Sequence, residues 1–156
     1  MSDGLSSDSR LVSFLLVEDD DDHAQLVMRT LKSNRVTNTI DRVKDGAEAL
    51  DYLYRRGRFA ETSRPDVILL DLKLPKVAGL EVLKVVKGDS QLKVIPVVVL
   101  TTSKAERDRA MAYEANANSY LVKPIDFGSF RKMAEDLNLY WGVWNQPIVD
   151  DGSPPS

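Results

Sequence analysis

The chain has 156 residues, of which 43% are hydrophobic, and its 24 acidic and 21 basic residues give a formal net charge of −3. A chain of this size is most simply one domain and can bury a core without disulfides. The charge balance argues against a nucleic-acid-binding surface, and the absence of cysteine excludes disulfides, zinc–thiolate sites and thiol catalysis.

Apolar segments typical of strands alternate along the chain with segments whose apolar residues recur at helical spacing. In chain order we predict a strand at 11–17, a helix at 21–33, a strand at 38–43, a helix at 47–56 stopped by Gly57, a loop at 58–65, a strand at 66–71, a helix at 78–88, a strand at 95–103, a helix at 104–116, a strand at 119–123 and a helix from 127 to about 142. Runs such as PVVVL lack polar alternation, which is typical of a parallel sheet covered on both faces. The pattern predicts a doubly wound, three-layer α/β sandwich.

No pattern in the sequence predicts export or membrane insertion. The N-terminal MSDGLSSDSR lacks the basic start and apolar segment of a signal peptide, and no apolar run approaches the roughly 20 residues needed to span a bilayer. We therefore expect a cytoplasmic protein with no membrane partner.

The polar residues that follow the predicted strands are chemically related. They are the acids Glu18 to Asp22, then Asp71, the hydroxyls Thr101 to Ser103, and Lys123. Ligands of a doubly wound sheet bind outside the carboxyl ends of its strands, so these side chains should meet at one edge. Carboxylates hold Mg²⁺, hydroxyl and ammonium groups bind phosphoryl oxygens, and one carboxylate would be available to attack phosphorus. The alternative is that each residue only caps or turns the chain, because loops are rich in Asp, Thr and Ser.

Four motifs occur in order at the ends of the predicted strands: LLVEDD, ILLDLKLPKVAGLEVL, IPVVVLTTS and SYLVKPID. Together they resemble the receiver domain of two-component response regulators, over roughly residues 12 to 140. The resemblance implies a flavodoxin-like, five-stranded parallel sheet with strand order 2-1-3-4-5. It also implies a signalling protein that catalyses only its own phosphorylation and dephosphorylation, and is otherwise not an enzyme.

The resemblance assigns a phosphoacceptor and a metal site. Asp71 would take a phosphoryl group from a phosphohistidine on a sensor histidine kinase. Glu18 and Asp19 match the acidic pair that binds Mg²⁺, with Asp19 as the more direct ligand. Asp71 and the backbone carbonyl of Lys73 would complete the metal site. The family often has Asn at position 73, so Lys73 brings an additional positive charge near the site.

The resemblance also assigns the groups that respond to the phosphate. Thr101 would bond a phosphoryl oxygen and move on activation, and Lys123 would pair with Asp71 or its phosphate. Tyr120 matches the switch aromatic, whose rotamer follows the threonine, and Pro124 is the expected cis-proline. Thr102 stands where the family favours a small residue.

The expected domain organisation is a disordered lead at 1–10, a receiver domain at 11–144 and a C-terminal arm at 145–156. Because the receiver takes most of the chain, no output domain fits, and we expect a stand-alone receiver that signals by protein–protein interaction. The long loop before the third strand, the IPVVVLTTS strand and the aromatic tail resemble the regulators that partner bacterial and cyanobacterial phytochrome kinases.

The last predicted helix continues into an aromatic segment with Tyr140, Trp141 and Trp144. Its apolar face outlasts the sheet on which it would pack, so we predict that these residues form a homodimer contact. The alternative is a tail folded on its own domain. We interpret His23, the single histidine, as a surface residue rather than a metal or phosphotransfer site, and Asp20 to Asp22 as a capping run.

Three other functions are considered for the same residues. A phosphatase with an aspartate nucleophile needs a second acid two residues after the nucleophile, where this chain has Lys73. A nucleotide-binding module needs a glycine-rich phosphate loop, and neither common motif is present. A pseudo-receiver that binds partners without phosphorylation stays open at this point.

Overall fold

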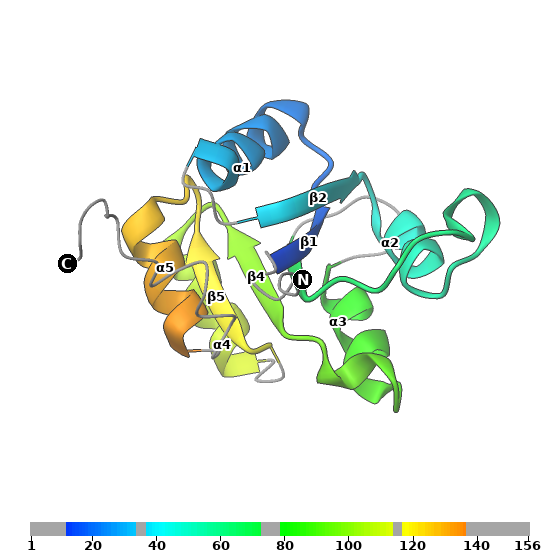
Figure 1. The fold of residues 1–156 in the computed structure, drawn as a ribbon. Helices are drawn as coiled ribbons and strands as arrows, with labels where there is room; N and C mark the ends of the chain where they lie inside the picture. Colours follow the sequence, from blue (N-terminus) through cyan, green and yellow to red (C-terminus); the bar gives the residue numbers. More distant parts are fainter. Residues whose placement is uncertain (1–11, 34–36, 73–78, 114–116, 137–156) are drawn as a thin grey trace.

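Five parallel strands form the central sheet in the computed structural model, which describes residues 12–33, 37–72, 79–113 and 117–136 (Figure 1). The strand order is β2-β1-β3-β4-β5, so the predicted doubly wound α/β fold and its strand order are confirmed. The strands are β1 (Val12–Val17), β2 (Thr37–Val43), β3 (Val67–Asp71), β4 (Val97–Thr101) and β5 (Ser119–Val122).

Helices follow the strands in alternation and cover both faces of the sheet (Figure 1). They are α1 (Asp21–Ser33), α2 (Gly46–Leu53), α3 (Gly79–Gly88), α4 (Lys104–Tyr113) and α5 (Phe127–Asp136), with short 3₁₀ segments η1 (Gly57–Phe59) and η2 (Leu92–Val94). Among the helices of the described residues, none is long and apolar enough to cross a membrane.

The two faces of the sheet carry separate hydrophobic cores because consecutive strand residues point to opposite sides. In β1, Phe14 and Leu16 pack with α1 and α5, whereas Leu15 and Val17 pack with α2 and α3. The Phe14 ring lies 5.7 Å from the ring of Phe130, centroid to centroid, and this pair joins the sheet to α5. Strands β1, β3 and β4 are therefore buried on both sides, and only their ends are open to chemistry.

The second helix ends earlier than predicted, and Gly57 is not its stop. The cap is Tyr54, and Arg55 takes the left-handed conformation with φ of 57°. The N–H of Arg56 donates to the carbonyl of Asp51 at 2.8 Å and that of Arg55 to the carbonyl of Tyr52 at 3.1 Å. This is a Schellman motif with arginine at the position where glycine is usual. The predicted loop that follows begins with η1.

The strand predicted at 95–103 is shorter at both ends. Pro96 has no N–H to give to the ladder, although its carbonyl accepts from the N–H of Ile68 at 3.0 Å. Ser103 lies beyond the strand and caps α4, since its hydroxyl oxygen accepts from the N–H of Glu106 at 3.0 Å. The helix predicted to reach about 142 is described as far as Asp136, and its remainder lies outside the described residues.

Candidate functional site

Two acidic residues, Glu18 and Asp19, directly follow the carboxyl end of β1. The N–H of Glu18 still bonds the sheet, donating to the carbonyl of Val43 at 3.0 Å, and the Nε of Arg42 donates to the carbonyl of Glu18 at 2.8 Å. These bonds hold the Glu18 side chain in the interior, where it is fully buried, while the next residue, Asp19, is exposed. One carboxylate therefore faces the core of the site and the other its opening.

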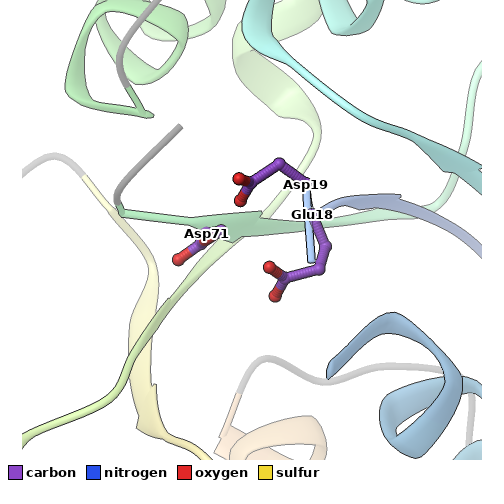
Figure 2. Close-up of side chains that lie close together, drawn as sticks. All are labelled: Glu18, Asp19 and Asp71. Carbon is purple, nitrogen blue, oxygen red and sulfur yellow. The ribbon is translucent and has the colours of Figure 1, made fainter. Parts of the chain in front are cut away.

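Asp71 is the last residue of the central strand β3 and is 6% exposed. Figure 2 shows its carboxylate beside those of Glu18 and Asp19, which come from the neighbouring strand end. One carboxylate oxygen from each residue lies within 4.8 Å of the other two. Three carboxylates at this spacing repel one another, and a hard divalent cation relieves the repulsion because such ions prefer oxygen ligands. The donor set fits Mg²⁺ or Mn²⁺.

Lys123 reaches the same cluster from the end of β5. Its Nζ is 2.7 Å from Oε1 of Glu18 and 3.6 Å from Oδ1 of Asp71, and its side chain is only 6% exposed. Its backbone N–H donates to the carbonyl of Thr101 at 2.7 Å, and the following Lys123–Pro124 bond is cis, as the family motif implies. The chain therefore brings an ammonium group to the acidic cluster from 105 residues away in sequence.

Thr101, the last residue of β4, is 1% exposed. Its hydroxyl donates to Oε1 of Glu106 at 2.8 Å, in the first turn of α4, and the hydroxyl of Thr102 approaches the same oxygen at 3.5 Å. Glu106 was not among the residues that we predicted for the site. Its signal was present, because Ser103 and Glu106 have the S-x-x-E spacing of a helix capping box.

His23 is less exposed than the surface residue that we predicted. Its Nδ1 lies 3.1 Å from Nζ of Lys123, 100 residues away, and the residue is half-buried. The error has a plain cause: nothing in the local sequence around a helical histidine indicates a contact made through the tertiary fold.

Asp20 and Asp21, which follow Asp19, make contacts at the start of α1. Asp20 caps α1, since its Oδ1 accepts from the N–H of His23 at 3.0 Å, and this hydrogen bond is the main reason that the pKa of Asp20 lies below its usual value. Asp21 forms an ion pair with Arg42 at 2.8 Å. These two residues therefore fix the first turn of α1 beside the site.

Gly79 begins α3 against the backbone of the candidate phosphoacceptor. A Cβ at this position would lie 2.5 Å from the carbonyl oxygen of Asp71 and 2.8 Å from that of Leu72. Real Cβ atoms essentially never come that close to backbone oxygens, so only glycine fits here without a shift.

The remaining predicted residues are less defined by the structure. Tyr120 of β5 is half-buried and packs beside the core formed with α2 and α3. Lys73, Tyr140, Trp141 and Trp144 lie outside the described residues.

A cavity of about 300 Å³ opens on the α1 side of the cluster. Its walls are His23, Leu26, Val27, Thr30, Thr102, Lys123, Pro124 and Ile125. Leu26 is 48% exposed, so an apolar surface adjoins the charged groups of the site.

The parallel sheet and the acids, hydroxyl and lysine at its carboxyl edge define a receiver domain of two-component signalling. Residues 14–135 match the family model for the response regulator receiver domain. The chain belongs to this family.

Two relatives align with the chain over most of their own length. The chain is 44% identical over 151 residues to the probable methanogenesis regulatory protein FilR2 of Methanothrix harundinacea, covering 94% of this chain and 97% of FilR2. It is 40% identical over 127 residues to the response regulator Rcp1 of Synechocystis, covering 81% and 86% of the two chains.

Solved structures show the same fold. The bacteriophytochrome response regulator AtBRR superimposes with a TM-score of 0.80 at 43% identity, covering 88% of this chain and 99% of AtBRR. The Mn²⁺-bound form of Rcp1 superimposes with a TM-score of 0.66 at 36% identity, covering 93% and 99%.

Proposed function

We propose that Asp71 accepts a phosphoryl group from the phosphohistidine of a sensor histidine kinase, and that the protein then signals by protein–protein interaction. One observation carries the proposal. Asp71 ends a central strand, nearly buried, with Glu18 and Asp19 within 4.8 Å and the Lys123 ammonium at 3.6 Å. We infer that it acts in the cytoplasm, where ATP supplies the kinase.

The chemistry follows from these positions. An oxygen of Asp71 attacks phosphorus, the bond from phosphorus to the kinase imidazole nitrogen breaks, and the imidazole leaves with its electron pair. The product is an acyl phosphate on Asp71. Glu18, Asp19 and Asp71 would hold Mg²⁺, whose positive charge would offset the negative charge of the phosphoryl oxygens. Lys73 is the fourth residue that we propose for this site, through its backbone carbonyl.

Two further groups bind the transferred phosphoryl oxygens. Lys123 donates from its ammonium group, already 3.6 Å from Asp71, and Thr101 donates from its hydroxyl. Because Thr101 bonds Glu106 of α4 in the present structure, its movement toward the phosphate would change the contacts at the start of that helix. Tyr120 of β5 is proposed to follow, which would shift an existing equilibrium of the surface around α4, β5 and α5.

The proposed kinase partner is a phytochrome. The similarity to AtBRR and to Rcp1 over most of their chains supports this choice, whereas the similarity to FilR2 favours a different signalling pathway. Phosphotransfer rates from a panel of purified histidine kinases decide between them. A phytochrome kinase should transfer fastest, and a faster transfer from a kinase without a photosensory domain would contradict the choice.

We also propose a homodimer through Tyr140, Trp141 and Trp144. The support is compositional, because aromatic residues are enriched at interfaces. Light scattering of the wild type and of a variant with Trp141→Ala and Trp144→Ala tests it. A wild-type dimer that becomes a monomer in the variant would support the contact, and an unchanged molecular mass would contradict it.

The decisive test of phosphorylation uses acetyl phosphate with Mg²⁺ and detects labelled protein by its shift in a phosphate-affinity gel. We expect labelling of the wild type, none after Mg²⁺ is chelated, and none in Asp71→Asn. Asp66→Asn is a matched control, because Asp66 lies just before β3 at the opposite end of the strand. Labelling that persists in Asp71→Asn would show another acceptor, and an unlabelled wild type would favour a pseudo-receiver.

A further inference from the structure

The ammonium of Lys123 contacts one side chain that has no part in the proposed phosphotransfer chemistry. Its Nζ lies 2.7 Å from Glu18 Oε1, 3.1 Å from His23 Nδ1 and 3.6 Å from Asp71 Oδ1. An ammonium group has three hydrogens and no lone pair, so Nδ1 of His23 accepts in this contact. The contact therefore requires the imidazole tautomer that carries its proton on Nε2.

We propose that His23 is a positioning residue that holds the ammonium of Lys123 toward Asp71. The inference rests on the proposed function, because it gives His23 a role only through Lys123 at the phosphoryl group. His23 itself does not touch the reacting atoms.

The position of the His23 ring is set by the start of α1. The backbone N–H of His23 donates to Oδ1 of Asp20 at 3.0 Å, and the N–H of Ala24 donates to the Asp20 carbonyl at 2.9 Å. Ala24 is 1% exposed and packs in the core beneath the helix. The first turn of α1 is thus anchored on two sides, and the ring is presented to Lys123 from a fixed backbone.

The side chain of Lys123 is nearly buried, but it borders a cavity on the side of α1. The distance to Asp71 is beyond a hydrogen bond, so Glu18 alone would fix the ammonium on one side only. The cavity of about 300 Å³ borders both Lys123 and His23, and a long lysine side chain could swing into it. By accepting one hydrogen beside this cavity, His23 confines Nζ to the side facing Asp71.

The first test compares rates of labelling by acetyl phosphate with Mg²⁺. His23→Leu removes the acceptor and should slow labelling by about two- to tenfold, the range expected for one hydrogen bond. His23→Gln keeps an acceptor and should recover part of the rate, which a purely space-filling role would not predict. Gln25→Leu is the matched control on the exposed face of the same helix and should label like the wild type. Equal rates for His23→Leu and the wild type would overturn the inference while leaving the proposed function in place.

The second test observes the contact directly and does not depend on phosphorylation. The chain has one histidine, so the long-range ¹H–¹⁵N spectrum of the imidazole needs no assignment. We expect the Nε2–H tautomer in the wild type and a displaced Nδ1 signal in Lys123→Met. An Nδ1–H tautomer in the wild type would overturn the inference. A third test returns to the rate of labelling. In Lys123→Met, adding His23→Leu should not slow labelling further, and a full additional loss would show that His23 acts independently of Lys123. If the wild type is not labelled at all, the proposed function fails and this inference fails with it.

Discussion

The hydroxyl of Thr101 donates a hydrogen bond to Oε1 of Glu106 at 2.8 Å and so ties the end of β4 to the first turn of α4. A threonine hydroxyl has one hydrogen, so it can donate to either Glu106 or a phosphoryl oxygen but not to both at once. If Thr101 has the proposed role, Glu106 stabilises the unphosphorylated arrangement.

Glu106→Ala should therefore favour the activated arrangement. The variant keeps the backbone N–H that bonds Ser103, so the helix cap is retained. We expect the affinity for beryllofluoride, a mimic of the phosphoryl group, to rise by about two- to tenfold, since one competing hydrogen bond is removed. Titration followed by tryptophan fluorescence or calorimetry measures it. Asp108→Ala on the same helix should leave the affinity unchanged, and a weaker affinity in Glu106→Ala would contradict the competition.

Gly79→Ala should disturb the site through the backbone of Asp71. The added Cβ would meet the Asp71 carbonyl oxygen at 2.5 Å, so the start of α3 has to shift. Overpacking of this kind typically costs about 1–3 kcal/mol, and urea unfolding should show the loss together with slower labelling. Gly88→Ala, at the other end of α3, meets nothing within 4 Å and should leave stability unchanged or slightly raised. Equal stability of the two variants would contradict the close approach.

Asp19→Asn should have opposite effects with and without a divalent cation. In a chelator, the variant should melt at a higher temperature than the wild type, because one of three carboxylates within 4.8 Å loses its charge. With excess Mg²⁺ the wild type should have the higher melting temperature, because Mg²⁺ binding stabilises its folded state. The variant should bind Mg²⁺ about tenfold more weakly or worse.

The neighbouring acid supplies the control for this reversal. Asp22 is exposed on α1 and is not part of the carboxylate group, so Asp22→Asn should show no comparable reversal. Melting curves in chelator and in Mg²⁺ measure both variants. A wild type whose melting temperature does not respond to Mg²⁺ would contradict the metal site.

Asp89 should make stability depend on pH in the acid range. Its carboxylate accepts from the hydroxyl of Tyr54 at 2.7 Å, which is the main reason that its pKa lies below the usual value of 3.8, with further bonds from the N–H groups of Gln91 and Leu92. A carboxylate whose pKa is lower in the folded than in the unfolded state stabilises the protein at pH values above its unfolded-state pKa. This stabilisation is lost as the pH falls through the folded-state pKa. The wild type should therefore exceed Asp89→Asn in stability at about pH 6, and the gap should narrow toward about pH 3. A stability difference between the wild type and Asp89→Asn that widens as the pH falls would contradict the lowered pKa of Asp89.

Leu26→Asp should slow phosphorylation by the kinase without slowing phosphorylation by a small phosphodonor. Leu26 is 48% exposed beside the cavity that borders Lys123, so a kinase that brings its phosphohistidine to Asp71 would cover it. We expect phosphotransfer from the kinase to slow by about tenfold or more, as for loss of an apolar anchor, while labelling by acetyl phosphate stays unchanged. Val94→Asp is the control, because Val94 is 76% exposed on η2, a different part of the fold. Equal losses with both phosphodonors would point to damage at the site itself.

The doubly wound sheet and the main chemical residues could be predicted from the sequence pattern, whereas the strand order was implied by the resemblance to receiver domains. The unbroken apolar runs that became β3 and β4 can be buried only in a sheet covered on both faces, and parallel strands place their carboxyl ends on one edge. Asp71 and Thr101 end these two strands. Glu18 and Asp19 follow β1 and Lys123 follows β5, so the meeting of these side chains at that edge follows from the alternation of strands and helices.

The contacts that tune the site were decided only by the tertiary structure. His23 meets Lys123 across 100 residues, and the close approach of Gly79 to Asp71 depends on where α3 crosses the end of β3. Arg55 ends α2 in a conformation that local sequence would assign to the nearby glycine. Hydrophobic periodicity carries information about which face of an element is buried, and none about which polar atom faces another across the fold. The sequence thus determined the edge at which phosphorylation chemistry is expected, and packing of the helices on the sheet determined the partners of each group there.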